Sequence, residues 1–211
     1  MFMRQAHTNL RRGGAFHHLR ALLRVHLPSY FLYVSIASAT DENSHQRTVV
    51  LKPEAAAIHW TLSGNMHTVH GTFELKRAVI DLNLNDGSVG GLVEVNAASG
   101  RSGNTARDQR MQSILESDRY PIISFHPTKV IGRVMPFRDE VVTVEGIFRI
   151  HGADHPLQMQ INIHPKGNAI ILKTEFAVPY VDWGMEDPSI LFFRVDRTVN
   201  IEVEATVRAG D

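Results

Sequence analysis

One arginine in this chain lies on the apolar side of a short predicted helix. Arg107 comes four, seven and eight residues before Met111, Ile114 and Leu115. This spacing places all four side chains on one helical face. The planar donors of a guanidinium suit a carboxylate, a phosphate or a quinone oxygen. Arg107 is therefore a candidate for holding the polar head of a ligand, and the alternative is a structural ion pair with Asp108 or another acid.

Other residue types capable of chemistry lack the spacing that it would need. The chain has 12 histidines and no cysteine. His67 and His70 are three residues apart, on opposite faces of a strand, and His151 and His155 flank a "GAD" turn without paired carboxylates. Neither pair has a zinc signature. Ser99 and Ser102 occur without a G-x-S-x-G elbow. We therefore predict no metal site, no cofactor, no catalytic residue and no enzymatic activity. His151 is expected to hydrogen-bond at a strand end, with contact to a ligand head as the alternative.

Charge is distributed unevenly along a chain whose formal net charge is zero. Residues 1–39 contain five arginines and no acidic residue, so the remainder carries 17 basic against 22 acidic residues, a net charge of −5. A body of that sign is a poor partner for nucleic acid, whose affinity comes largely from neutralised phosphates. We therefore expect no nucleic-acid partner.

The first 39 residues are typical of an export leader. A basic stretch precedes the apolar run "LPSYFLYVSIASA", which ends in Ala37, Ser38 and Ala39, the small-residue form that signal peptidase accepts. Thirteen residues containing Pro28 are too few to span a bilayer, which needs roughly 20. We predict a leader over residues 1–39, a single domain over 40–211, and a periplasmic or secreted protein. The alternative is a mis-started or unstructured N-terminus.

The domain is dominated by apolar and polar residues that alternate with a period of two. In "VTVEGIFRI", Val142, Val144 and Phe148 share one face. The segments 157–163 and 199–207 alternate in the same way, and further candidate strands are 57–63, 71–84, 89–97, 122–131, 169–178 and 190–196. One-sided burial of this kind is typical of antiparallel sheets with one wet face. About eight or nine strands without alternating helices predict an all-β sandwich or closed barrel.

A single helix is predicted over residues 105–118. Thr105 and Asp108 resemble a capping box at its start, and Tyr120 before Pro121 disfavours helical backbone at its end. A helix with one apolar side in an all-β domain is expected to cap one end of that domain.

Several segments together resemble the YceI-like family of lipid- and polyisoprenoid-binding proteins. They are "MHTVHGTFE", "SGNTARDQRMQS", "RYPIISF", "GIFRIHGADHPLQMQI", "YVDWG" and "VNIEVEAT", which follow the family's order over roughly residues 57–207. The resemblance implies an eight-stranded antiparallel, lipocalin-like barrel with the helix at one end. It also implies an apolar tunnel that binds one isoprenoid or acyl chain without transforming it.

In such a barrel the inward aromatic side chains would form the tunnel wall. The alternative for each ring is that it fills a packed core. The complete set of expected ligand-binding residues is Trp60, Phe73, Arg107, Met111, Ile114, Leu115, Phe125, Phe148, His151, Phe176, Trp183 and Phe193.

The function expected from this reading is non-enzymatic binding or carriage of a polyisoprenoid, an isoprenoid quinone or a fatty-acyl lipid. The alternatives are a barrel enzyme acting on a similar lipid and a secreted structural or stress module without a ligand. The expected partner is a hydrophobic small molecule, with the membrane only as its source. A homodimer is compatible with the sequence.

Overall fold

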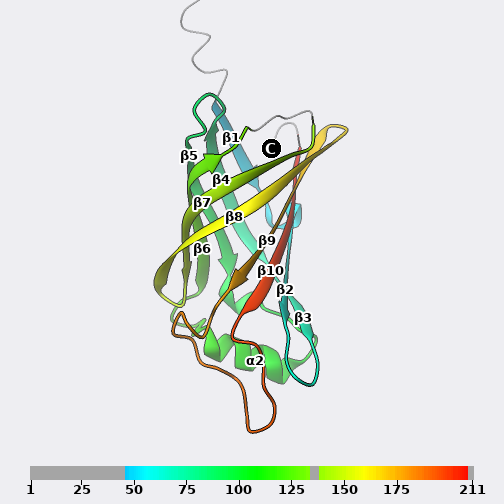
Figure 1. Cartoon of the computed structure of the whole chain (residues 1–211), viewed down its shortest axis with the longest axis vertical. Coiled ribbons are helices and arrows are strands. Elements are labelled where there is room, and N and C mark those ends of the chain that lie inside the picture. Colours follow the sequence, from blue (N-terminus) through cyan, green and yellow to red (C-terminus); the bar gives the residue numbers. More distant parts are fainter. Residues whose placement is uncertain (1–45, 134–137, 209–211) are drawn as a thin grey trace, which may run out of the picture. The chain divides into compact units, whose positions relative to one another are not determined.

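Ten strands form one antiparallel sheet that curls around an apolar interior (Figure 1). The computed structural model describes residues 46–133 and 138–208, so the predicted leader lies outside the described residues. The strands are β1 (Gln46–Leu51), β2 (Ala56–Leu62), β3 (Val69–Phe73), β4 (Leu75–Asn83), β5 (Val89–Asn96), β6 (Ile122–Ile131), β7 (Glu140–Ile150), β8 (Ala153–Lys166), β9 (Ala169–Val178) and β10 (Val199–Arg208). Their hydrogen-bonded order is β1-β4-β5-β6-β7-β8-β9-β10-β2-β3.

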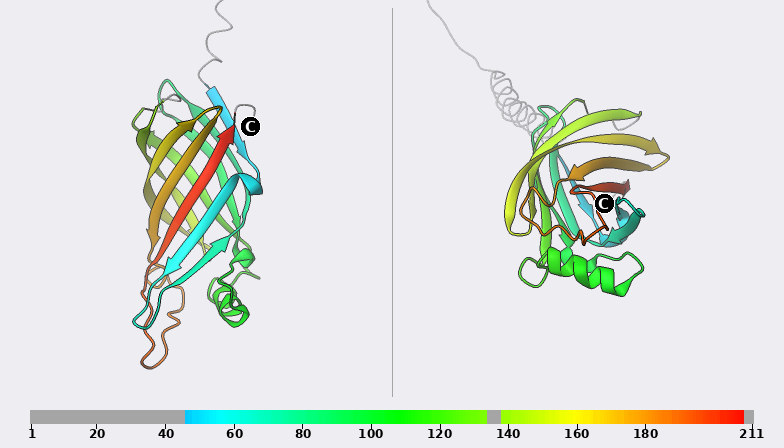
Figure 2. Two further views of the ribbon diagram at one scale, coloured as in Figure 1. Left: turned by 90° about the vertical axis from the view of Figure 1, so that its right-hand side faces the viewer. Right: turned by 60° about the horizontal axis from the view of Figure 1, so that its bottom comes forward.

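The prediction of eight strands in a closed barrel was wrong in both respects. A 3-10 turn, η1 (Pro53–Ala55), separates β1 from β2, and Glu74 separates β3 from β4. Just after Glu74, the register of β4 against β5 shifts between Leu75 and Arg77. Pro53 has no N–H to donate to a ladder, which favours an interruption there. The sheet curls until β10 pairs with β2, but β1 and β3 remain as edges, so the barrel is not fully closed (Figure 2).

The edge at β3 is covered by the chain that follows β5. Thr72 of β3 and Arg101 exchange two backbone hydrogen bonds of 2.8 and 3.0 Å. A second 3-10 turn, η2 (Ala97–Ser99), lies between the end of β5 and Arg101. It is capped by Asn96, whose side-chain oxygen accepts a hydrogen bond from the Ala98 N–H. Covering an edge in this way removes unpaired backbone groups from solvent.

The ten strands confirm the predicted all-β class, and burial along them follows the period-two alternation of the sequence. Along β7 the positions from Val142 to Ile150 that were assigned to one face are buried, while Val141 and Arg149 are exposed. The candidate strand 190–196 was wrong. That segment forms a tight turn in the long connection from β9 to β10, with only isolated bridges.

The predicted helix exists but is shorter than residues 105–118. Helix α2 (Thr105–Ile114) is capped by Asn104, whose side-chain oxygen accepts the Arg107 N–H at 3.0 Å, rather than by a Thr105–Asp108 box. It ends because Glu116 has a φ of +46°, which breaks the helical path before Tyr120 is reached.

Helix α2 lies at one end of the curled sheet, as expected (Figure 2). Met111, Ile114 and Leu115 pack against the buried cluster that contains Phe148 and Val178. Asp108 is buried and accepts hydrogen bonds from the Ser102 N–H at 2.8 Å and the Ser102 hydroxyl at 2.6 Å, so it fixes the loop that leads into the helix. Among the described residues, no helix is both long and apolar enough to cross a membrane.

Candidate functional site

The interior of the barrel is a cavity of about 600 Å³ with an almost wholly apolar wall. Inward positions of the sheet supply most of the wall, and α2 supplies its end. This volume is within the range of small-molecule binding sites, about 300–1,000 Å³. The alternation that builds the sheet therefore also builds the site.

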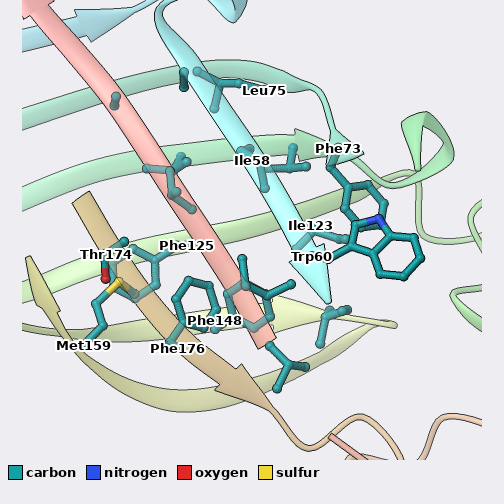
Figure 3. Close-up of a pocket in the computed structure, with 18 of the residues that line it drawn as sticks. Ile58, Trp60, Phe73, Leu75, Ile123, Phe125, Phe148, Met159, Thr174 and Phe176 are labelled. Carbon is teal, nitrogen blue, oxygen red and sulfur yellow. The ribbon is translucent and has the colours of Figure 1, made fainter. Parts of the chain in front are cut away.

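Five of the predicted aromatic residues face this cavity. Figure 3 shows Trp60, Phe73, Phe125, Phe148 and Phe176 directed into it, together with aliphatic neighbours such as Ile58 and Leu75. The rings of Phe148 and Phe176 meet edge to face with centroids 5.8 Å apart. Aromatic rings in such contacts bury large apolar areas without a hydrogen-bonding requirement.

The indole of Trp60 lies flat over its neighbouring strand because Gly71 is its cross-strand partner. A Cβ at position 71 would be only 2.4 Å from the indole carbons. The Phe125 ring uses Gly146 in the same way, at 2.5 Å. These two glycines leave room for the rings, and each aromatic side chain covers backbone that would otherwise be exposed to the cavity.

The two remaining aromatic candidates for the wall, Trp183 and Phe193, lie elsewhere. Trp183 stacks on His155, with ring centroids 3.9 Å and planes 7° apart, and its ring also packs against that of Phe148. Loss of hydration in this stack lowers the pKa of His155. Phe193 is exposed at a turn. Neither ring lines the cavity, although Tyr180, Met185 and Pro188 of the same connection between β9 and β10 do.

His151 follows the end of β7 and does not reach the cavity either. Its Nε2 is 3.0 Å from a Glu116 carboxylate oxygen, and its ring meets that of Tyr120 edge on, with centroids 5.5 Å apart. It therefore ties the turn after α2 to the turn after β7.

Arg107, Met111, Ile114 and Leu115 all line the α2 end of the cavity. Asp108, which was considered as a partner for Arg107, is engaged by Ser102 instead. Within the part of the chain that the structure describes, Arg107 forms no ion pair, whereas Arg110 one turn later pairs with Glu186. A half-buried guanidinium thus borders an apolar space and is available to an anionic or carbonyl group.

Sequence reasoning missed most of the aliphatic wall. The cavity is also lined from four different strands by Val93, Val142, Val144, Met159, Ile201 and Val203. Their signal was present in the alternation, since each occupies an inward position. What the pattern could not show was that these side chains surround a space instead of filling it.

Two polar atoms on this wall have no hydrogen-bond partner among the described residues. They are the Trp60 Nε1–H and the Thr174 hydroxyl, and both are inaccessible to solvent. A buried hydroxyl without a partner costs about 1–3 kcal/mol.

We therefore expect Thr174→Val to raise the free energy of unfolding by about 1 kcal/mol, because valine has nearly the same shape and no hydroxyl to desolvate. Urea denaturation of delipidated protein measures the change. A variant less stable than the parent would show that the hydroxyl is satisfied in the folded protein.

The long connection between β9 and β10 is anchored close to the cavity. Tyr180 is buried and donates its hydroxyl hydrogen to the Asp196 carbonyl oxygen at 2.9 Å. Burial, with smaller contributions from nearby carboxylates, raises the pKa of Tyr180 to about 12, so the phenol stays protonated and keeps this hydrogen bond at physiological pH. Arg197 also pairs with Asp182 at 2.8 Å across the base of the connection.

Among residues 46–133 and 138–208, no group of three or more histidine, cysteine, aspartate or glutamate side chains could hold a metal ion. The cavity offers apolar area and the side chains of Arg107 and Arg110, of which Arg110 pairs with Glu186.

The domain is thus an incompletely closed antiparallel barrel with an apolar interior cavity and a helix at one end. The YceI-like domain profile matches residues 49–207, and the chain belongs to the YceI-like family. No curated protein matches the chain in sequence.

Two solved structures share the fold. BcnA of Burkholderia cenocepacia is 12% identical with a TM-score of 0.61, over 75% of this chain and 99% of BcnA. A polyisoprenoid binding domain from Saccharophagus degradans, implicated in plant cell wall breakdown, is 14% identical with a TM-score of 0.54, over 77% of this chain and 98% of that domain. At these identities the likeness concerns the fold.

Proposed function

We propose that the protein binds one long-chain apolar lipid inside the barrel and carries it without chemical change. The ligand classes that suit the site are a polyisoprenoid, an isoprenoid quinone and a fatty-acyl lipid. The observation that carries the proposal is the apolar cavity of about 600 Å³. Family membership and the polyisoprenoid binding domain that shares the fold support it.

The cavity suits a hydrocarbon tail because its affinity can come from burial alone. Each buried methylene contributes roughly 0.8 kcal/mol before ordering costs, so a tail of a dozen carbons needs few polar contacts. The head of the ligand would lie at the α2 end, where Arg107 borders the cavity. We also propose that this binding takes place in the periplasm or outside the cell, and the predicted leader supports this location.

Incubation with a total lipid extract separates this proposal from the two alternatives. A carrier returns an intact lipid, which mass spectrometry of the extracted ligand identifies. An altered lipid would contradict carriage and favour an enzyme. Protein that takes up no lipid would instead favour a structural module.

A substitution at Arg107 tests the orientation of the ligand. We expect Arg107→Met to weaken binding of an acidic or phosphorylated lipid by about 1.5–3 kcal/mol, because the aliphatic bulk remains while the charge-assisted hydrogen bonds are lost. A neutral lipid with the same tail should bind unchanged. Isothermal titration of both lipids measures the difference.

Arg119→Met is the matched control, since Arg119 lies on the exposed side of the following turn and pairs with Glu116. It should affect neither lipid. If the parent and Arg107→Met bound the acidic lipid with equal affinity, Arg107 would not contact the head of the ligand.

A further inference from the structure

Beyond the cavity, the most unusual surface of the domain is a projecting apolar turn. Residues 190–193, Ile-Leu-Phe-Phe, are here called the apolar tip. All four side chains are exposed, Leu191 by 81% and Phe192 by 87%. Figure 1 shows the connection that carries them extending past α2 at the end of the barrel. A contiguous group of large exposed apolar side chains marks an interaction site.

The backbone holds the apolar tip in one shape. Ile190 and Phe193 exchange two backbone hydrogen bonds of 2.9 Å, which leaves Leu191 and Phe192 at the turn. Leu191 has a φ of +50°, a conformation that glycine and asparagine adopt at much lower cost. A leucine at this position adds both backbone strain and exposed apolar area, so folding alone does not account for it.

The apolar tip is also fastened to the turn between β2 and β3. The Asn65 side chain donates to the Phe192 carbonyl at 2.8 Å and accepts the Arg194 N–H at 3.0 Å. Gly64 and Val195 form an isolated antiparallel β-bridge between the same two segments. Met66, which is itself exposed, lies in the fastened turn and adds a fifth apolar side chain at this end of the domain.

This end of the domain is also the end of the cavity. Pro188, just before the apolar tip, and His67, just after Met66, both line the cavity, as does Arg107 of α2. Arg107 and Arg194 form no salt bridge with any other residue that the structure describes. Cations next to apolar side chains match the boundary between lipid headgroups and acyl chains, where arginine extends its charge toward the headgroups.

We propose that the apolar tip inserts into a lipid bilayer and docks the cavity end of the domain on the membrane surface. A bilayer surrounds a narrow projection on all sides, whereas a stable protein partner needs a broad face of about 800 Å². A docked domain would let an apolar ligand pass between membrane and cavity without crossing water. The docking itself does not require a ligand and goes beyond the proposed carriage.

Sedimentation with vesicles of phosphatidylcholine and phosphatidylglycerol in equal parts tests this proposal on the full chain. We expect the parent to sediment with vesicles and the double variant Leu191→Ser, Phe192→Ser to bind at least about tenfold more weakly, because two inserted apolar side chains are lost. Val141→Ser is the matched control. It removes a 55% exposed valine near the start of β7, remote from α2, and should bind as the parent does.

A parent that stays in the supernatant, or a double variant that sediments as strongly as the parent, would overturn the proposal. A parent that is dimeric without vesicles, together with a double variant that is monomeric, would also overturn it. The apolar tip would then contact a second copy of the chain and not a bilayer. Phe192→Trp gives an independent reading, since its emission should shift to shorter wavelength with vesicles, and an unchanged spectrum would count against insertion.

Lipid uptake from detergent keeps docking and carriage separable. The double variant should take up lipid as the parent does, since neither Leu191 nor Phe192 lines the cavity. Loss of vesicle binding with normal uptake in the double variant is the expected result. If the parent bound vesicles but took up no lipid, the proposed carriage would be contradicted and the membrane docking would still be supported.

Discussion

Val203→Trp is expected to reduce affinity for a long-chain lipid by about 100-fold or more. Val203 lies in β10 opposite Ile58 and Thr174, and its side chain lines the cavity. An indole at this position occupies space that a tail would fill. Excluding about four methylenes at roughly 0.8 kcal/mol each accounts for the loss.

The neighbouring position provides the control for this variant. Glu202 is exposed on the other face of β10, so Glu202→Trp adds the same ring outside the barrel. Titration with a fluorescent fatty acid should show near-parental affinity for Glu202→Trp and little binding by Val203→Trp. Parental affinity of a folded Val203→Trp would place the ligand somewhere other than this cavity.

Phe148→Ala should lower the free energy of unfolding by about 3–5 kcal/mol. Phe148 is only 8% exposed, and its ring packs against those of Phe176 and Trp183, at centroid distances of 5.8 and 6.0 Å. Truncation removes both contacts and enlarges a space that the wall cannot collapse to fill. Urea denaturation monitored by tryptophan fluorescence measures the change.

Phe192→Ala is the matched control, because Phe192 is 87% exposed. It should change the free energy of unfolding by less than about 0.5 kcal/mol. If the two alanine variants proved equally stable, Phe148 would not belong to the core that the structure describes.

The sequence was most informative where a residue's direction follows from its position along a strand. The inward placement of Phe125, Phe148 and Phe176 follows from period-two alternation, which survives small errors in strand boundaries. The helical face shared by Arg107 and Met111 was predictable for the same reason, with the helical period in place of the strand period.

The errors arose where the backbone leaves regular structure. Phe193 was assigned to a strand because "ILFFRV" is apolar, but a two-residue turn at Leu191 reverses the chain there, and no glycine or asparagine marks it. The interruption at Glu74 divided the expected strand 71–84 into β3 and β4, and β1, which precedes Pro53, was not among the expected strands. In the strand order, β1 and β3 remain as edges, so the barrel is incompletely closed. The cap at Asn104 was missed because Thr105 offered an equally plausible one.

Whether inward side chains fill a core or surround a cavity depends on how far the curled strands lie apart. That separation is set by pairings between distant segments, such as β10 with β2, and not by any local pattern. The apolar tip was likewise beyond prediction, because its exposure depends on Asn65, more than a hundred residues away in sequence.

The central claim, that the cavity holds one lipid, is tested most directly by native mass spectrometry of the protein purified from its own host. We expect a species heavier than the chain by the mass of a single lipid, released on denaturation and absent from Val203→Trp. A spectrum that shows only the mass of the chain for the parent, prepared without detergent, would contradict the claim.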